Sequence, residues 1–233
     1  MRRVRARRAR HARPPRGQPF TYGRIAGLYD SSLRLFGFTR AVEQFLERVD
    51  WCLPPRPRAL DAGAGTGLNG LWFLRHFPGS EVVAFDIDRQ MLAVLARRAR
   101  RLGDLRHRLT VAHGDLRAPA VLTRIDTGQA IVLAPRSFDA VMVGAALEHV
   151  PLDAVLERLA RLLRPGGLFL NLGMRPGPSS AMLGRLYRFR PYTTGEVRRR
   201  LERLGFVDVH TLRLTPAEFP ANLTRIAVTA RKA

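Results

Sequence analysis

Short apolar runs alternate with longer stretches of helical spacing from Arg58 to the end of the chain. Four runs have the length of buried strands and lie at 81–85, 109–113, 138–144 and 168–172, after a first strand that begins at Arg58. In the other stretches, apolar residues recur at every third or fourth position, as on one buried helix face. The pattern predicts helices from 66 or 67 to about 78, and at 89–102, 151–163 and 194–204.

This alternation of strand and helix indicates an α/β fold, with a mostly parallel sheet and helices on both of its faces. Residues 207–214 and 222–230 alternate in polarity and are expected to form a final antiparallel pair, which gives seven strands in all. The segment 116–137 is long for a connection between two strands. Its residues 131–133 leave an extra strand or hairpin open, and we assign this segment no role.

Charge sets the N-terminal segment apart from the rest of the chain. The formal net charge of the 233 residues is +21, and eight arginines fall within the first seventeen residues. No acidic residue occurs before Asp30. Such a segment is expected to be disordered. It is interpreted as a solvated tail or an over-long start, with contact to an anionic membrane or nucleic acid, or targeting, as the alternatives.

The expected organisation is an Arg-rich tail at 1–20 and a single domain at 21–233, whose first part, 21–57, forms a helical cap. Segment 174–193 is expected to be a substrate lid, with apolar residues at Met182, Leu183, Leu186, Tyr187 and Phe189. No apolar run reaches the roughly 18 residues of a membrane span. The single cysteine, Cys52, excludes an internal disulfide and a cysteine cluster for zinc, so we predict a cytoplasmic protein without a metal site.

The glycine-rich stretch after the first strand carries the candidate chemistry. Gly65, Gly67 and Gly70 fit the dinucleotide pattern GxGxxG, with Asp86 nineteen residues after Gly67. The same stretch fits the GxGxG pattern of enzymes that use S-adenosylmethionine (SAM). Asp61, at the end of the strand, favours the second interpretation, because a carboxylate repels a pyrophosphate and attracts the positively charged amino group and sulfonium of SAM.

Several motifs in order resemble those of the class I SAM-dependent methyltransferases, from about Tyr22 to the C-terminus. The resemblance is to the group with ubiquinone/menaquinone C-methyltransferases and bacterial phospholipid N-methyltransferases, which have a Rossmann-like fold. The matching segments are 60–67 (LDAGAGTG), 83–88 (VAFDID), 114–116 (GDL), 137–150 (SFDAVMVGAALEHV), 162–168 (LLRPGGL) and the Tyr-x-x-x-Ala-x-x-Tyr-Asp start at 22–30.

The resemblance implies a role for individual residues of the glycine loop and of the next strand. Gly63, Gly65 and Gly67 would let the main chain pass beside the methionine part of SAM, with Asp61 near its amino group. Asp86 would accept both ribose hydroxyls. The next residue, Ile87, would contact the adenine, while Asp88 is expected to cap the following helix.

Further residues are implied at the other loops. Asp115, with Leu116, would accept a hydrogen bond from the adenine amino group, or Asp115 is only a turn residue. Tyr22 and Tyr29 would cover SAM, or they are ordinary packing aromatics. Ala145 belongs to the loop over the reacting methyl group.

The sulfonium of SAM already activates the methyl group, so the protein mainly has to hold the acceptor in line, which can supply about 7 to 11 kcal/mol. A base is needed only for some acceptors. His149 or Glu148 is the candidate, with His149 better matched to neutral pH or else a structural histidine.

The motifs of enzymes that methylate nucleobases are absent. Residues 144–146 (GAA) are not Asn/Asp-Pro-Pro-aromatic, and there is no Pro-Cys nucleophile. A small-molecule or lipid-like methyl acceptor is therefore favoured. An RNA methyltransferase, a non-catalytic SAM-binding scaffold and a nicotinamide oxidoreductase are the alternatives.

Overall fold

The computed structural model describes residues 37–177, 180–181, 184–185 and 189–233. The predicted Arg-rich tail at 1–20, the motif residues Tyr22 and Tyr29, and the first part of the 21–57 cap lie outside the described residues. So does part of the 174–193 segment, including Met182, Leu183, Leu186 and Tyr187.

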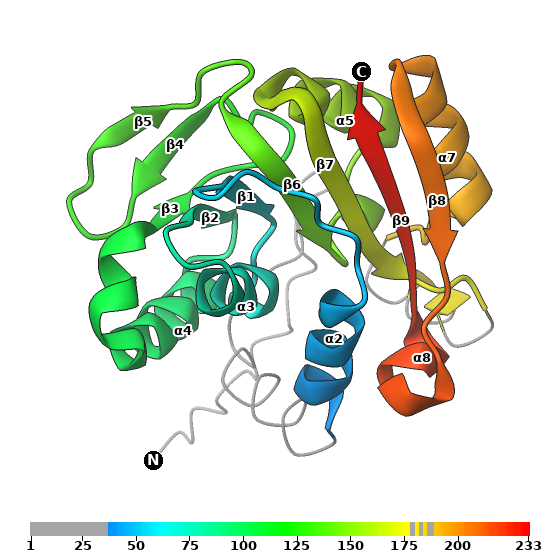
Figure 1. The fold of residues 1–233 in the computed structure, drawn as a ribbon, viewed down its shortest axis with the longest axis horizontal. Coiled ribbons are helices and arrows are strands. Elements are labelled where there is room, and N and C mark those ends of the chain that lie inside the picture. Colours follow the sequence, from blue (N-terminus) through cyan, green and yellow to red (C-terminus); the bar gives the residue numbers. More distant parts are fainter. Residues whose placement is uncertain (1–36, 178–179, 182–183, 186–188) are drawn as a thin grey trace, which may run out of the picture.

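A twisted sheet of nine strands runs through the molecule (Figure 1), in the order β5-β4-β3-β2-β1-β6-β7-β9-β8. Its strands are β1 Arg58–Ala62, β2 Glu81–Asp86, β3 Leu109–His113, β4 Val121–Arg124, β5 Ala130–Val132, β6 Phe138–Gly144, β7 Leu163–Met174, β8 Phe206–Leu212 and β9 Arg225–Lys232.

The five central strands, β3-β2-β1-β6-β7, pair in parallel, and the pairs toward both edges are antiparallel. This confirms the mostly parallel sheet and the antiparallel C-terminal pair. The number of seven strands was wrong, because the segment 116–137 contributes the hairpin β4–β5. Those strands are only four and three residues long, too short to produce a recognisable alternation of polarity.

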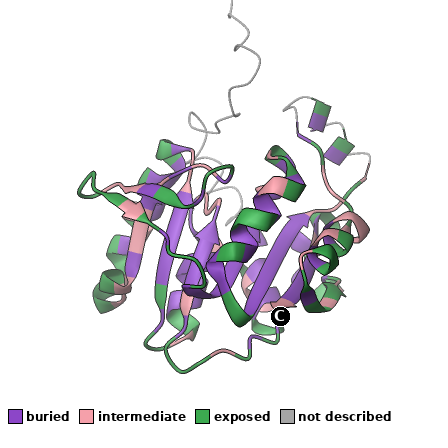
Figure 2. Cartoon of the chain, turned by 90° about the horizontal axis from the view of Figure 1, so that it is seen from above, coloured by how far each residue is buried: buried purple, intermediate pink, exposed green. Residues whose placement is uncertain are grey.

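Helices cover both faces of the sheet, as predicted. The helices are α2 Phe38–Glu47, α3 Leu68–His76, α4 Arg89–Ala99, α5 Leu152–Leu162, α7 Thr194–Arg203 and α8 Ala221–Thr224, with short 3-10 helices η2 Arg100–Arg108, η3 Leu147–His149 and η4 Pro216–Glu218. Buried residues of the strands lie between the helical layers, whose outward-facing residues are exposed (Figure 2).

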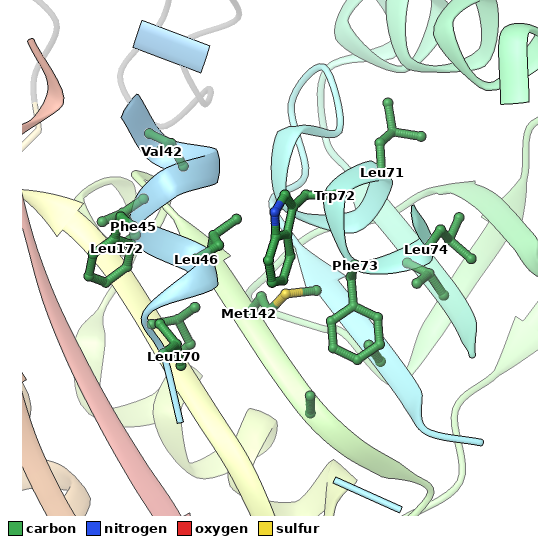
Figure 3. Packing of buried hydrophobic residues seen from close by; sticks show 14 of the residues in the cluster. Val42, Phe45, Leu46, Leu71, Trp72, Phe73, Leu74, Met142, Leu170 and Leu172 are labelled. Atoms are coloured by element: carbon green, nitrogen blue, oxygen red, sulfur yellow. The ribbon is translucent and has the colours of Figure 1, made fainter. Parts of the chain in front are cut away.

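The core is divided in two by the sheet. Successive residues of a strand point to opposite faces, and on β1 Ala59 belongs to the cluster under α2, α3 and α4, whereas Leu60 belongs to the cluster under α5 and α7. Figure 3 shows α2 and α3 side by side on the first face, with Phe45 of α2 near Leu172 of β7 and Trp72 of α3 near Met142 of β6.

Both tryptophans lie in one aromatic cluster beside α3. The rings of Trp51 and Trp72 are 5.5 Å apart, Trp51 meets Phe73 edge-on at 5.4 Å, and the imidazole of His76 stacks on Trp72 at 4.3 Å. The indole N–H of Trp51 donates to the carbonyl of Leu46 at 2.9 Å. The cluster therefore joins the end of α2 to the helix that follows the glycine loop.

An ion pair anchors α2 to the opposite end of the chain. Arg48 donates through Nε to Oε1 of Glu218 at 2.5 Å and through Nη2 to Oε2 at 3.0 Å. Glu218 is buried in η4 between β8 and β9. Two hydrogen bonds in parallel give this contact a defined geometry as well as charge complementarity.

Several element boundaries differ from the prediction, among them β7, which spans Leu163–Met174 instead of 168–172. Helix α4 ends at Ala99 rather than near 102, and η2 continues the chain with Gly103 at a φ of 56°. Pro151 precedes α5 in an extended conformation instead of starting its first turn. β9 begins at Arg225 rather than 222, because α8 occupies the preceding residues.

Candidate functional site

The carboxyl ends of the parallel strands bring the predicted motifs to one edge of the sheet. β1 pairs with β2 on one side and with β6 on the other. The strand order therefore reverses beside β1, and ligands of open α/β sheets bind in the crevice at such a switch point. The loops that follow β1, β2, β3 and β6 all lie at this edge.

Asp61 lies on β1 beneath the glycine loop and is fully buried. Its Oδ2 accepts the backbone N–H of Gly70 at 2.8 Å, so the carboxylate fixes the start of α3. Its Oδ1 is buried without a hydrogen-bond partner in the described structure. Burial raises the pKa of Asp61 to about 7, and the hydrogen bond from Gly70 and the side-chain amide of Asn69 oppose this rise.

The three motif glycines have left-handed backbone angles, but their surroundings differ. A Cβ at Gly63 would lie 2.4 Å from the Cβ of Ala146, and one at Gly67 would lie 2.2 Å from Leu95. Both glycines are therefore required by packing. Among the described residues, no atom lies within 4 Å of the position that a Cβ would take at Gly65, where φ is 54°. This is therefore the part of the loop that a ligand can approach.

A side chain of α4 holds the same loop from outside. Nη1 of Arg98 donates to the carbonyl oxygen of Thr66 at 2.9 Å and to its Oγ1 at 3.2 Å. Thr66 lies between Gly65 and Gly67. Arg98 therefore restrains a loop in which glycines alone would leave considerable backbone freedom.

Asp86 is the last residue of β2, and its carboxylate accepts two backbone hydrogen bonds. The N–H of Gly65 donates to Oδ2 and the N–H of Asp88 donates to Oδ1, each at 2.8 Å. Its carboxylate therefore lies directly beside the exposed part of the glycine loop. Burial raises the pKa of Asp86, against these hydrogen bonds. Asp88 caps α4 as predicted, since its Oδ1 accepts the N–H of Gln90 and of Met91. Ile87 between them is half-buried.

Asp115 follows β3 and is held by its neighbour Arg117. The guanidinium donates to Oδ2 through Nη2 at 2.6 Å and through Nε at 2.9 Å, and the backbone N–H of Arg117 donates to Oδ1 at 2.8 Å. Partial burial works to raise the pKa of Asp115, but these contacts outweigh it and the pKa is lowered. Leu116 is buried and packs near Gly63.

The loop after β6 closes the site from the other side. Ala145 has a φ of 49°, an uncommon conformation for a residue with a Cβ, and its N–H donates to the carbonyl of Leu172 at 3.0 Å. This sharp turn directs the chain so that Ala146 meets Gly63.

The two candidate bases are adjacent residues of the 3-10 helix η3, and their side chains lie in different surroundings. Glu148 is buried, and its Oε1 accepts the backbone N–H of Met174, so its carboxylate is turned into the protein. His149 is exposed at the rim, with its ring centroid 5.0 Å from that of Phe189. Surrounding protein atoms lower its pKa, against the charge of Glu148, which raises it.

An open cavity of about 610 Å³ lies against this loop. Residues 148–151 form one side of it, and Gly184, Arg185, Phe189, Arg190 and Tyr192 form the other. The backbone N–H of Arg190 donates to the carbonyl of Glu148 at 3.1 Å, and the hydroxyl of Tyr192 donates to that of Val150 at 3.0 Å. These bonds keep the two sides together.

The sequence motifs did not indicate Arg98 and Arg117 as contacts of the motif residues. Arg98 lies in a run with Arg97, Arg100 and Arg101, a pattern that by itself indicates a solvated helix face. A signal existed, because Leu95 and Arg98 are three residues apart and lie on one side of the helix. Leu95 packs against Gly67, so the same side faces the glycine loop.

Comparison with known proteins places this geometry in a family. Residues 60–169 match the sequence model of a family described as methyltransferase domain. These residues form a methyltransferase domain. The match spans the glycine loop, Asp86, Asp115 and the loop after β6, and it confirms the resemblance to SAM-dependent methyltransferases.

Two named relatives are similar to more than half of this chain. The nocamycin O-methyltransferase of Saccharothrix syringae is 35% identical over 164 residues, which cover 68% of this chain and 51% of the relative. The demethylmenaquinone methyltransferase of Tropheryma whipplei is 30% identical over 155 residues, which cover 63% and 54%. The chain thus spans about half the length of the curated relatives it matches.

A solved structure confirms the fold. The geranyl diphosphate C-methyltransferase of Streptomyces coelicolor was solved in complex with Mg²⁺, geranyl diphosphate and S-adenosyl-L-homocysteine. It superimposes with a TM-score of 0.65 at 16% identity, covering 83% of this chain and 77% of that chain. Within the described ranges, no helix is long and apolar enough to span a bilayer, and no group of three or more His, Cys, Asp or Glu side chains is arranged to hold a metal ion.

Proposed function

We propose that this protein is an enzyme that transfers a methyl group from SAM to a small-molecule or lipid-like acceptor by in-line displacement. The observation that carries the proposal is the position of Asp86, whose carboxylate is hydrogen-bonded to Gly65 at the switch point of the sheet. In this arrangement the ligand can lie against the main chain of the glycine loop, while the carboxylate beside it accepts hydrogen bonds from hydroxyl groups of the same ligand.

The residues of the site fit SAM in three respects. Asp86 has two oxygens with free lone pairs besides the two that accept backbone N–H groups, which suits two vicinal ribose hydroxyls. Gly65 allows a ligand to approach the main chain. Asp61 supplies a buried carboxylate at the end of β1, which fits a nearby amino group.

The other predicted SAM contacts follow from the loops at the same edge. Asp115 would accept the adenine amino group with Ile87 and Leu116 beside the ring, and Ala145 would lie near the reacting methyl. Arg117 competes for Asp115, so adenine binding requires a partial rearrangement of that ion pair. Tyr22 and Tyr29 remain predicted covers of the cofactor.

SAM, when bound, supplies a methyl group that its sulfonium makes electrophilic. The protein has to exclude water and hold the acceptor in line, and the cavity beside His149 offers a site for this. The lowered pKa of His149 keeps its imidazole neutral at pH 7, ready to accept a proton from a hydroxyl or an acidic carbon. Glu148, with its carboxylate turned inward, is the weaker of the two predicted bases.

The acceptor class is supported by the relatives, whose names refer to menaquinone precursors, nocamycin and geranyl diphosphate. The cavity has apolar walls at Val150, Pro151 and Phe189. An RNA acceptor, membrane contact through the Arg-rich tail and a cytoplasmic location have no observation in their favour beyond the composition of the sequence, and they stay predictions.

Calorimetric titration of the purified chain with SAM, S-adenosylhomocysteine and NADH tests the proposal. We expect micromolar binding of the first two and none of NADH. Asp86→Ala should weaken SAM binding at least tenfold, whereas Asp104→Ala, an exposed carboxylate in η2, should leave it unchanged. Binding of NADH alone would make the protein an oxidoreductase, and binding of none would favour a non-catalytic scaffold.

A further inference from the structure

The cavity beside η3 combines an apolar wall with an excess of positive charge. Four of its lining residues bear ionisable groups that matter here: Glu148, His149, Arg185 and Arg190. The distribution of their charges decides what kind of acceptor the cavity can hold. This question rests on the proposed function, because it concerns the acceptor of the same methyl transfer.

The single carboxylate of this set is withdrawn from the cavity. Glu148 is 5% exposed, its Oε1 accepts the N–H of Met174, and its Oε2 has less than 1 Å² of accessible surface. It therefore contributes to the cavity mainly through its main chain, whose carbonyl accepts the N–H of Arg190. An amine on the ligand would find no accessible anion there.

The two arginines present their charge to solvent on the opposite side. Arg185 is exposed, and within the described ranges no carboxylate pairs with it. Arg190 is 70% exposed and donates through Nη2 to Oε1 of Glu196 at 2.5 Å. Its guanidinium carries five N–H donors, so the ion pair leaves the others for a second acceptor.

Glu196 is itself held at the start of α7. Its Oε2 accepts the N–H and the hydroxyl of Thr193 at 2.9 and 3.0 Å, which completes a capping box. Its charge is therefore shared between the helix start and Arg190. Glu196 therefore orients the guanidinium of Arg190, which also lies over the ring of Tyr192 at 5.4 Å. The guanidinium still has donors left to bind an anion.

We propose that the methyl acceptor is an amphipathic anion, whose carboxylate or phosphate group binds Arg185 and Arg190 while its apolar part lies against Phe189, Val150 and Pro151. Guanidinium groups bind such oxyanions in forked pairs of hydrogen bonds. The arrangement leaves His149, on the same cavity, to face the reacting part of the acceptor.

Hexyl phosphate is the probe, with hexanol and hexylamine as ligands of equal chain length. Each is titrated calorimetrically into the full chain in the presence of saturating S-adenosylhomocysteine. We expect hexyl phosphate to bind at least tenfold more tightly than hexanol and hexylamine to bind no better than hexanol. Equal binding of all three, or preference for the amine, would overturn the proposal.

Two pairs of substitutions locate the binding. R185Q/R190Q should weaken hexyl phosphate binding at least tenfold, whereas R97Q/R101Q, which removes two exposed arginines from α4 and η2, should change it less than twofold. Glu196→Gln keeps the capping box and removes the charge beside Arg190, so it should increase the affinity. Equal losses in both double variants would show that only net charge matters and would refute the site.

The source of the anion is distinguished with phosphatidylglycerol vesicles. Vesicle binding that R185Q/R190Q reduces and R97Q/R101Q does not would assign the anion to a lipid headgroup, and hexyl phosphate binding without such vesicle binding would assign a soluble acceptor. S-adenosylhomocysteine binding is measured on every sample. Its failure would refute the proposed function, whereas its persistence without hexyl phosphate binding would refute this inference alone.

Discussion

The buried carboxylate of Asp61 makes a prediction about stability that depends on pH. A rise of its pKa from the ordinary value of 3.8 to about 7 corresponds to about 4 kcal/mol of unfolding free energy. The native state binds the proton more tightly than the unfolded state. Stability should therefore fall as the pH rises from about 4 to about 7, and the full cost is present above pH 7.

Asp61→Asn removes this titration and keeps an oxygen for the N–H of Gly70. The amide has a fixed packing cost that does not change with pH, so the useful quantity is the difference between wild type and variant at two pH values. From the same shift, the variant should gain about 2 to 3 kcal/mol relative to wild type between pH 5 and pH 8.

Urea denaturation of both proteins at pH 5, 6, 7 and 8, followed by circular dichroism, measures this difference. The slopes with urea should agree between the proteins, so that midpoint shifts report stability. A constant difference at all four pH values would refute the reasoning, because it would mean that Asp61 titrates alike in the folded and unfolded chain. A variant whose stability relative to wild type decreases from pH 5 to pH 8 would refute the reasoning as well.

Three other contacts lead to distinct outcomes. Arg98→Ala frees the glycine loop, so it should weaken S-adenosylhomocysteine binding about three- to tenfold in calorimetry with little change in thermal midpoint. Arg97→Ala, on the exposed side of α4, should leave the binding unchanged. Equal effects of the two substitutions would argue against a role of Arg98 in restraining the loop. Arg48→Ala should destabilise the fold by about 1 to 3 kcal/mol in urea at pH 7, since it leaves the buried Glu218 without its partner, and an unchanged midpoint would contradict this. His149→Gln should lower kcat about 100-fold or more with unchanged S-adenosylhomocysteine affinity. Because the pKa of His149 is lowered, wild-type activity should fall only as the pH drops below 6.5, the ordinary pKa of histidine. A variant of full activity would exclude the imidazole as the base.

The fold was predictable because the central strands are continuous apolar runs between amphipathic helices. The third and fourth predicted strands match β3 and β6 residue for residue. The hairpin β4–β5 was left open, since three or four residues at a sheet edge carry too little apolar periodicity. The end of α4 was misplaced because Leu102 continues the helical spacing, although Gly103 already takes a left-handed backbone angle.

The motif residues were predictable as a set, but their contacts were not. Sequence order indicated that Asp61, Asp86 and Asp115 follow neighbouring strands, and parallel pairing then brings them to one edge. It gave no indication that Asp61 is sealed under the loop, or that Arg117 folds back onto Asp115. Such contacts depend on side-chain directions in loops, which have no period to detect.

The aromatic cluster at α3 makes the intrinsic fluorescence of the protein a local signal. The chain has two tryptophans, Trp51 and Trp72, and their rings are 5.5 Å apart. At this distance the two indoles exchange excitation and behave as one emitter. Gly67, the last residue of the glycine loop, directly precedes the helix that bears Trp72. A change in emission will therefore report events at the glycine loop or the docking of α2.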